Sequence, residues 1–130
     1  MAALAPDLSS QAIEIGVLPT LASQALGPHG SPEIFLHLHR IAVLLSGYLA
    51  NGLYSTSALI LAWSARHIYP AWITAAGLAV AAFGFALSVA ALMDSVAGMF
   101  WTNVFLVPSL LLWLGALAII PPMPGWKSGH

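Results

Sequence analysis

The 130-residue sequence contains no cysteine. This absence excludes disulfides, thiolate zinc sites, cysteine-ligated iron–sulfur clusters and cysteine nucleophiles. Charge is also scarce, because only 5% of the residues are Asp, Glu, Lys or Arg, against about 25% in an average soluble domain. The formal net charge is −1, and there is no basic cluster of the kind that binds nucleic acid.

The familiar catalytic motifs are absent as well. The chain has no HExxH, no Gly-rich phosphate loop and no GxSxG. No acidic residue lies inside an apolar run, which argues against a proton-pump relay. The N-terminus has no basic stretch ahead of an apolar core and does not resemble a signal peptide. The sequence therefore predicts no catalytic residue and no metal site, and it favours a protein without enzyme activity.

Long apolar runs dominate what remains. Hydrophobic residues make up 60% of the chain, and they gather in runs at about 41–65, 69–93 and 96–120. A helix of about 25 residues is ~37 Å long, enough to cross the ~30 Å hydrocarbon core of a bilayer. The links between the runs are very short, so neighbouring helices must be antiparallel. The prediction is an all-α integral membrane protein in which 33–130 form three transmembrane helices in an up-down-up bundle.

Residues 1–32 differ from the rest in being rich in proline and glycine. Their moderately apolar middle carries Glu14 and is interrupted by Pro19, so it is too short to span a membrane. Leu18 and Leu21 share a helical face. We expect an N-terminal interfacial arm, with a short amphipathic helix that lies on the membrane or on a partner. An irregular tail and a re-entrant element stay open.

Aromatic and basic residues give a predicted depth and orientation. The positive-inside rule counts Lys and Arg, and it favours the side of Arg66 and Lys127 over that of Arg40 as cytoplasmic. This predicts an N-out, C-in protein of a bacterial inner membrane or an organellar membrane. The aromatic residues near the run ends fit the two interfacial belts; they are Trp63, Tyr69, Trp72, Trp101 and Trp126.

Small residues in the second run predict close helix packing. Apolar burial does not drive helix association in lipid, whereas small residues allow backbones to approach. The run carries an alanine ladder, Ala82, Ala86 and Ala90. Two further small pairs occur, Gly77 with Ala81 and Gly84 with Ser88. These patterns place the helix centrally in a bundle or an oligomer.

The first run is the more polar one, and Tyr48, Asn51 and Ser55 fall on one side of it. Asn103, in the third run, could share a site with them. A membrane-embedded amide needs partners for its two donors and its acceptor. Asn51 is therefore either an interhelical hydrogen-bonding residue or a ligand contact in a pocket.

Three titratable residues, His37, His39 and Arg40, introduce the first run. His37 and His39 are about 200° apart on a helix, so they cannot face one metal. The favoured interpretation is a polar helix end facing headgroups or partner groups, with Arg40 snorkelling. Contact of these residues with haem or quinone is the alternative.

The segment LHRIAVLLSG resembles the Leu-His-Arg stretch that opens the first membrane helix of cytochrome b subunits of succinate dehydrogenase. Those subunits are small proteins with three spans. The resemblance implies a position near quinone for Arg40. Leu36 stands where that family has a Ser, and the family's haem-ligating His is missing from ALSVAALMDS.

The segment SGYLANG resembles the Asn-Gly stretch of small membrane isomerases such as styrene oxide isomerase. Leu45 stands in place of that family's His, and that family's fourth span is missing. Neither resemblance assigns the chain to a family.

The sequence thus combines rich packing surfaces with little chemistry. It predicts a small non-catalytic subunit of a larger membrane assembly, of the respiratory or photosynthetic electron-transfer kind. Its partners would be other membrane subunits or further copies of itself, together with the lipid bilayer. The alternative is a small homo-oligomeric, isomerase-like membrane enzyme, or an anchor that contacts haem or quinone, with a pocket at the Asn51 face.

Overall fold

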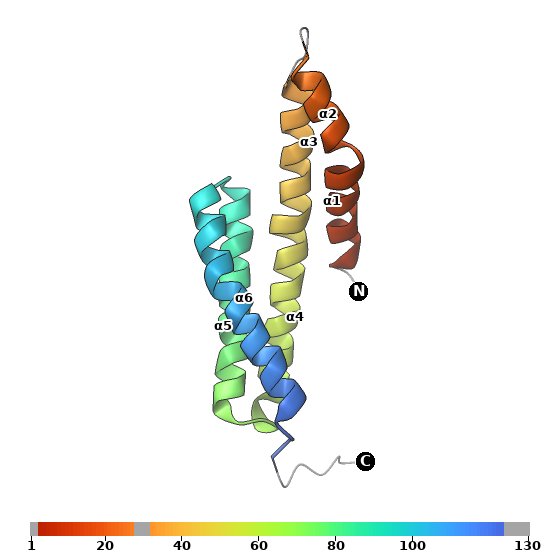
Figure 1. Cartoon of the computed structure of the whole chain (residues 1–130). Helices are drawn as coiled ribbons and strands as arrows, with labels where there is room; N and C mark the ends of the chain where they lie inside the picture. The colour runs from red at the N-terminus through yellow and green to blue at the C-terminus, as the bar shows by residue number, and fades with distance from the viewer. Residues whose placement is uncertain (1–2, 28–31, 124–130) are drawn as a thin grey trace.

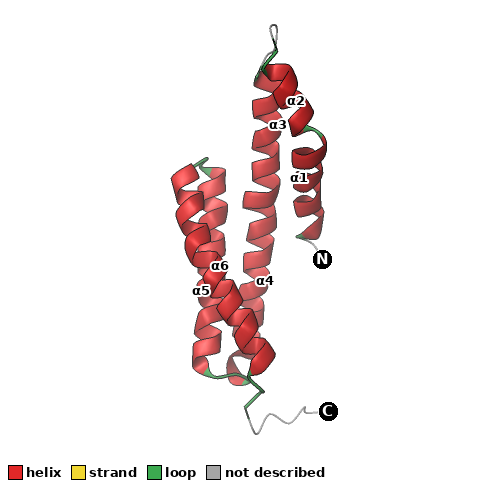
Figure 2. Ribbon diagram, in the orientation of Figure 1, coloured by secondary structure: helices red, strands yellow, loops and turns green. Residues whose placement is uncertain are grey.

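The computed structural model describes residues 3–27 and 32–123. Every regular element in these two ranges is a helix, and no strand occurs in them (Figure 2). Three helices are long and apolar enough to cross a membrane, Glu33–His67, Ala71–Leu92 and Val96–Ile119. The prediction of an all-helical bundle with three such helices is therefore confirmed. The predictions for Trp126 and Lys127 concern residues outside the described ranges.

The first long helix is continuous but changes its winding. It consists of α3 (Glu33–Val43), the π-helix η1 (Leu44–Ala50), α4 (Asn51–Ser64) and the short 3₁₀-helix η2 (Ala65–His67). A π-helix uses i→i+5 bonds and is common at functional sites. The carbonyl of Ala42, just before η1, accepts the hydroxyls of Ser10 and Ser46 at 3.0 and 3.1 Å. Side-chain donors at such a carbonyl favour the wider turn that follows.

The second and third long helices form a hairpin, α5 (Ala71–Leu92) and α6 (Val96–Ile119). The turn between them uses Asp94 in the left-handed region, at φ 57°. Ser95 then caps α6 by accepting a bond from the Gly98 N–H at 3.2 Å. Since α5 packs along both α4 and α6, it is the central helix of an up-down-up arrangement (Figure 1).

Glycines let α5 approach its neighbours closely. A Cβ at Gly77 would lie 2.7 Å from both Ala62 and Trp113, and a Cβ at Gly84 would overlap the Ser55 hydroxyl. Ala81 and Ser88, the predicted partners of these glycines, are buried. The packing face of α5 therefore includes all four residues of the two predicted small pairs, Gly77, Ala81, Gly84 and Ser88.

The alanine ladder has a different place. Ala90 is buried, but Ala82 and Ala86 face outward and are exposed. The ladder therefore does not form a single packing surface inside this chain.

The N-terminal arm contains two helices, α1 (Leu4–Gly16) and α2 (Leu18–Ala25). The break between them falls just before Pro19, which has no N–H to continue the helical bonding. In Figure 1, α1 lies beside α3 and η1, on the side of the long helix away from the α5–α6 hairpin. Ser10 is only 1% exposed in this contact and Ala42 is fully buried. The arm is thus docked on the long helix along its first half.

Candidate functional site

A cleft of about 320 Å³ opens where the arm, the long helix and the hairpin meet. We call it the polar cleft. Its apolar walls are Val43, Gly47, Leu87 and Met99. Its polar lining comes from four elements and consists of Asp7, Ser46, Asn51, Tyr54 and Asn103.

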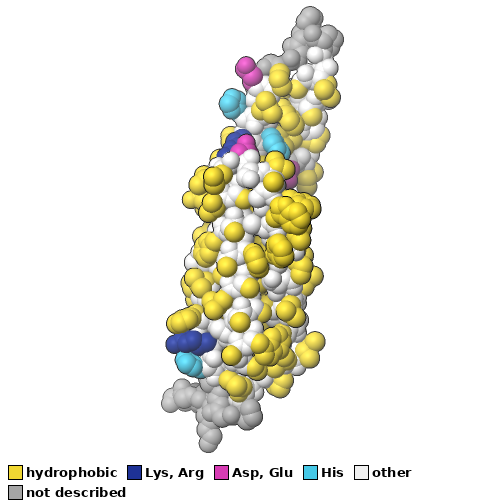
Figure 3. Space-filling model, turned by 90° about the vertical axis from the view of Figure 1, so that its left-hand side faces the viewer, with side chains coloured by type: hydrophobic (Ala, Val, Ile, Leu, Met, Phe, Trp, Pro, Cys, Tyr) yellow, Lys and Arg dark blue, Asp and Glu magenta, His cyan; other side chains and the backbone are white. Residues whose placement is uncertain are grey.

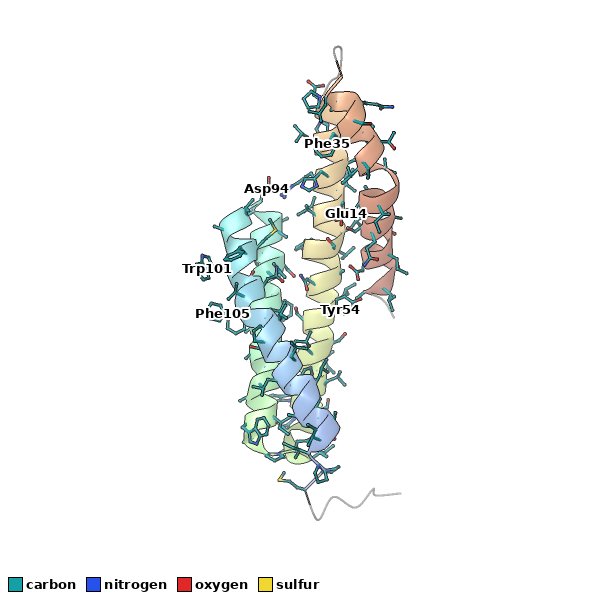
Figure 4. The ribbon with its side chains drawn as sticks, in the orientation of Figure 1. Glu14, Phe35, Tyr54, Asp94, Trp101 and Phe105 are labelled. Atoms are coloured by element: carbon teal, nitrogen blue, oxygen red, sulfur yellow. The ribbon has the colours of Figure 1, made fainter. Side chains whose placement is uncertain are left out.

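Each polar side chain reaches the cleft for a local reason. Asp7 lies in the first turn of α1, where a helix favours an acid. The bond from Ser10 to Ala42 holds α1 against the end of α3, and Asp7 lies about one turn nearer the start of α1. Asn51 and Tyr54 stand three residues apart on α4 and so share a face. Tyr54 lies at the level where α1 begins (Figure 4).

Hydrogen bonding in the polar cleft is incomplete. Ser46 donates to Ala42 O, and the amide of Asn103 donates to Met99 O at 3.0 Å. The side chains of Asp7, Asn51 and Tyr54 make no hydrogen bond to any residue in 3–27 or 32–123. The cleft therefore presents a carboxylate, both asparagine oxygens, the Asn51 amide protons and a phenol to an occupant.

The structure brings together part of the polar set predicted from the sequence. Asn51 and Asn103 line the same cleft. Ser55 lies with Asn51 in the next hollow, of about 360 Å³, where its hydroxyl donates to the backbone oxygen of Asn51 at 2.7 Å. Tyr48 instead lines a separate hollow beside Phe85. Within the described residues, no hydrogen bond from the Asn51 side chain ties two helices together, so its interhelical role has no support inside one chain.

Asp7 and Tyr54 are site residues that the sequence analysis missed. Nothing in the sequence shows that the arm docks beside Asn51, so Asp7 could not be placed there. Tyr54 carries a usable signal in its spacing of three from Asn51, because residues three apart share a helical face.

Arg40 holds two helix ends together. Its guanidinium donates to the carbonyls of Ala91 at 2.9 Å and Leu92 at 2.7 Å, and it pairs with the Asp94 carboxylate at 2.8 Å. These carbonyls belong to the last turn of α5, where helix geometry leaves backbone acceptors without partners. Asp94 lies at the turn between α5 and α6, on the side of the hairpin that faces the long helix (Figure 4). Arg40, which the sequence offered as a cofactor contact, therefore uses its guanidinium to join α3 to the end of α5.

Within the part of the chain that the structure describes, the two histidines have no comparable partners. His37 and His39 are exposed on α3, and His39 stacks on Phe35 with 6.1 Å between ring centroids. Across the described ranges, no group of three or more His, Cys, Asp or Glu side chains could hold a metal ion. Contact of His37 and His39 with a cofactor stays a prediction.

Comparison of the chain with models of known protein families, with curated proteins and with solved structures finds no match. Asp7 is the one carboxylate of the polar cleft, and no His or Ser beside it forms a nucleophile–base pair among the residues that line it. The arrangement is suited to binding by charge and hydrogen bonds.

Proposed function

We propose that this chain is an integral membrane protein that crosses the bilayer three times and serves as a small non-catalytic subunit of a larger membrane assembly. The length of α5, 22 residues, corresponds to about 33 Å and matches the hydrocarbon core. On the face shown in Figure 3, charged and histidine side chains lie toward the two ends of the molecule, and the band between them is hydrophobic or uncharged. That distribution supports insertion with one charged level at each membrane surface.

The observation that carries the subunit proposal is the projection of α2 and the start of α3 beyond the hairpin (Figure 1). Past the level of Arg40 and Asp94, the exposed fraction of Leu26 is 89%, that of Ile34 60% and that of Leu36 57%. Large apolar side chains beyond the hydrocarbon core are costly in water, at about 25 cal/mol per Å². Contact with another subunit, with the arm held at the membrane interface, removes that cost.

A pair of variants tests this proposal. The double variant Leu26→Ser/Leu36→Ser should release the chain from its assembly while its helix content is unchanged, since both side chains are exposed. Gln24→Ser is the control, because Gln24 is an exposed polar residue of α2, two positions before Leu26. This variant should stay in the assembly. The measurement is co-purification from native membranes in mild detergent. Retention of the double variant in the assembly at the level of the control would contradict the proposal.

A second candidate function is an anchor that contacts haem or quinone, within an electron-transfer assembly. The exposed positions of His37 and His39 on the projecting part of α3 support it, because another subunit could supply the second axial ligand there. The test is the visible spectrum of the assembly purified from native membranes. A Soret band that disappears in His37→Ala/His39→Ala favours the anchor, and a band that persists in that variant removes it.

A further inference from the structure

The polar cleft is the upper end of a longer groove. Helices α4 and α6 both pack along α5, and three hollows follow one another between them. The polar cleft shares Asn51 and Tyr54 with a hollow of about 360 Å³. That hollow shares Leu61 and Trp113 with a third one of about 250 Å³, which continues toward the loop after α4.

The character of the groove changes along its length. The polar end carries the Asp7 carboxylate and the asparagine oxygens described above. The two lower hollows are lined mostly by aliphatic and aromatic side chains; among them are Leu61, Leu106, Leu110, Trp113 and Leu117. A groove with polar groups at one end and apolar walls over the rest matches a molecule that is itself amphiphilic.

The size of the hollows favours a slender occupant. Each has a volume of 250–360 Å³, whereas a helix with its side chains is about 10–12 Å across. A hydrocarbon chain fits this space better than a helix of another subunit does.

Charge selects the head group. Among residues 3–27 and 32–123, no Lys or Arg lines the polar cleft, and the guanidinium of Arg40 is already bonded to α5 and Asp94. An anionic head would meet the Asp7 carboxylate without a counter-charge. An ammonium group supplies both the opposite charge and N–H donors for the free oxygens of Asp7, Asn51 and Asn103.

We propose that the groove between α4 and α6 binds an amphiphile with an ammonium head group, held at Asp7, Asn51 and Asn103, and with its hydrocarbon chain lying along α5. Asn51 is eleven residues beyond Arg40 on the same long helix, so its end of the head-group site lies about 16 Å below the level of Arg40. This depth lets the head enter from the membrane surface on the arm's side. The proposal is independent of whether the chain is a subunit of an assembly.

Thermal stabilisation of the detergent-solubilised protein tests it, with each probe at the same mole fraction in the micelles. The probes are dodecylamine, phosphatidylethanolamine, dodecanol and dodecanoate. We expect the amine-bearing probes to stabilise the protein and the other two to leave its Tm unchanged. Stabilisation by dodecylamine alone assigns the site to free single-chain amines, and stabilisation by phosphatidylethanolamine assigns it to a lipid head group.

Two variants with matched controls examine the two ends of the groove. Asp7→Asn should weaken dodecylamine binding about tenfold or more, because a charge-assisted bond is lost, whereas Glu14→Gln on the same helix should not. Leu61→Trp should block the part of the groove that takes the hydrocarbon chain of the ligand. Ile60→Trp should not, because Ile60 is exposed and does not line the groove. Equal stabilisation by dodecylamine, dodecanol and dodecanoate overturns the proposal. So does equal dodecylamine binding by all four variants.

Discussion

Arg40 shows how a single charged residue can define one end of a helical bundle. Its bonds to Ala91 and Leu92 reach acceptors that the end of α5 leaves open, and its positive charge suits the negative end of that helix. The ion pair with Asp94 adds less, since the Asp94 side chain is 68% exposed. The contact joins two residues 54 positions apart and fixes the hairpin against α3.

The first prediction concerns this contact. Replacing Arg40 by Lys keeps the charge but loses the planar fork that reaches two carbonyls at once. We expect Arg40→Lys to cost on the order of 1–2 kcal/mol of stability, seen as a lower Tm by circular dichroism. Arg66→Lys is the control, because within the described residues Arg66 bonds only to the nearby Trp63 carbonyl and lies over the Trp63 ring. If the two variants have equal Tm values, the guanidinium fork at Arg40 does not stabilise the hairpin.

Asn51 is the second residue with a clear expectation. Its side chain has no hydrogen-bond partner within 3–27 and 32–123, so Asn51→Leu removes an amide and breaks no bond between helices. The free energy of unfolding should stay the same or rise, by up to about 1 kcal/mol. The measurement is reversible unfolding in detergent. A marked loss of stability would show that Asn51 ties the helices together, contrary to the geometry described above.

At the scale of elements, α5 determines the packing. A methyl group at Gly84 would collide with the Ser55 hydroxyl on α4. Gly84→Ala should therefore separate α4 from α5 and cost about 1–3 kcal/mol, the usual range for overpacking. Thermal unfolding of the isolated chain measures this effect.

Two further variants make the test specific. The double variant Gly84→Ala/Ser55→Ala lacks the Ser55 hydroxyl. The atom of residue 55 that is then nearest to the new Cβ at position 84 is its own Cβ, at 3.2 Å. Part of the stability lost in Gly84→Ala should therefore return. Ala86→Leu, on the exposed face of α5, should leave the isolated chain unaffected. If Ala86→Leu is the more harmful of the two single variants in the isolated chain, then the packing face has been assigned to the wrong side of α5.

The elements themselves follow largely from sequence patterns. Apolar runs and short links are sufficient to predict three helices and their antiparallel order, and Pro32 and Pro121 mark where the first begins and the last ends. The π-helix is different, because the carbonyl just before it, that of Ala42, accepts the hydroxyl of Ser10 from 32 positions away. Local patterns carry no information on such a contact.

The candidate site was predictable only in part for the same reason. The polarity of Asn51 and Asn103 in apolar runs is visible in the sequence, and both line the polar cleft. Asp7 belongs to a segment whose docking is a tertiary event. Tyr48 has the right polarity but lies inside η1 and lines another hollow, since a π-helix changes the angular spacing assumed for an α-helix.

For the molecule as a whole, the absence of cysteine makes the proposed topology directly measurable. Single cysteines at His67 and Asp94 should react with a membrane-impermeant maleimide from opposite sides of sealed vesicles. The N-out, C-in orientation predicts that His67→Cys reacts from the cytoplasmic side and Asp94→Cys from the other side. Labelling of both from one side would rule out the three-span arrangement.

The most direct test of the subunit proposal is the mass of the particle in which the chain resides. The chain should be extracted from its native membranes in mild detergent and measured by native mass spectrometry. The proposal predicts a particle well above the 13.6 kDa of the chain that contains at least one other kind of polypeptide. A single 13.6 kDa chain, or an oligomer of this chain alone, would contradict it.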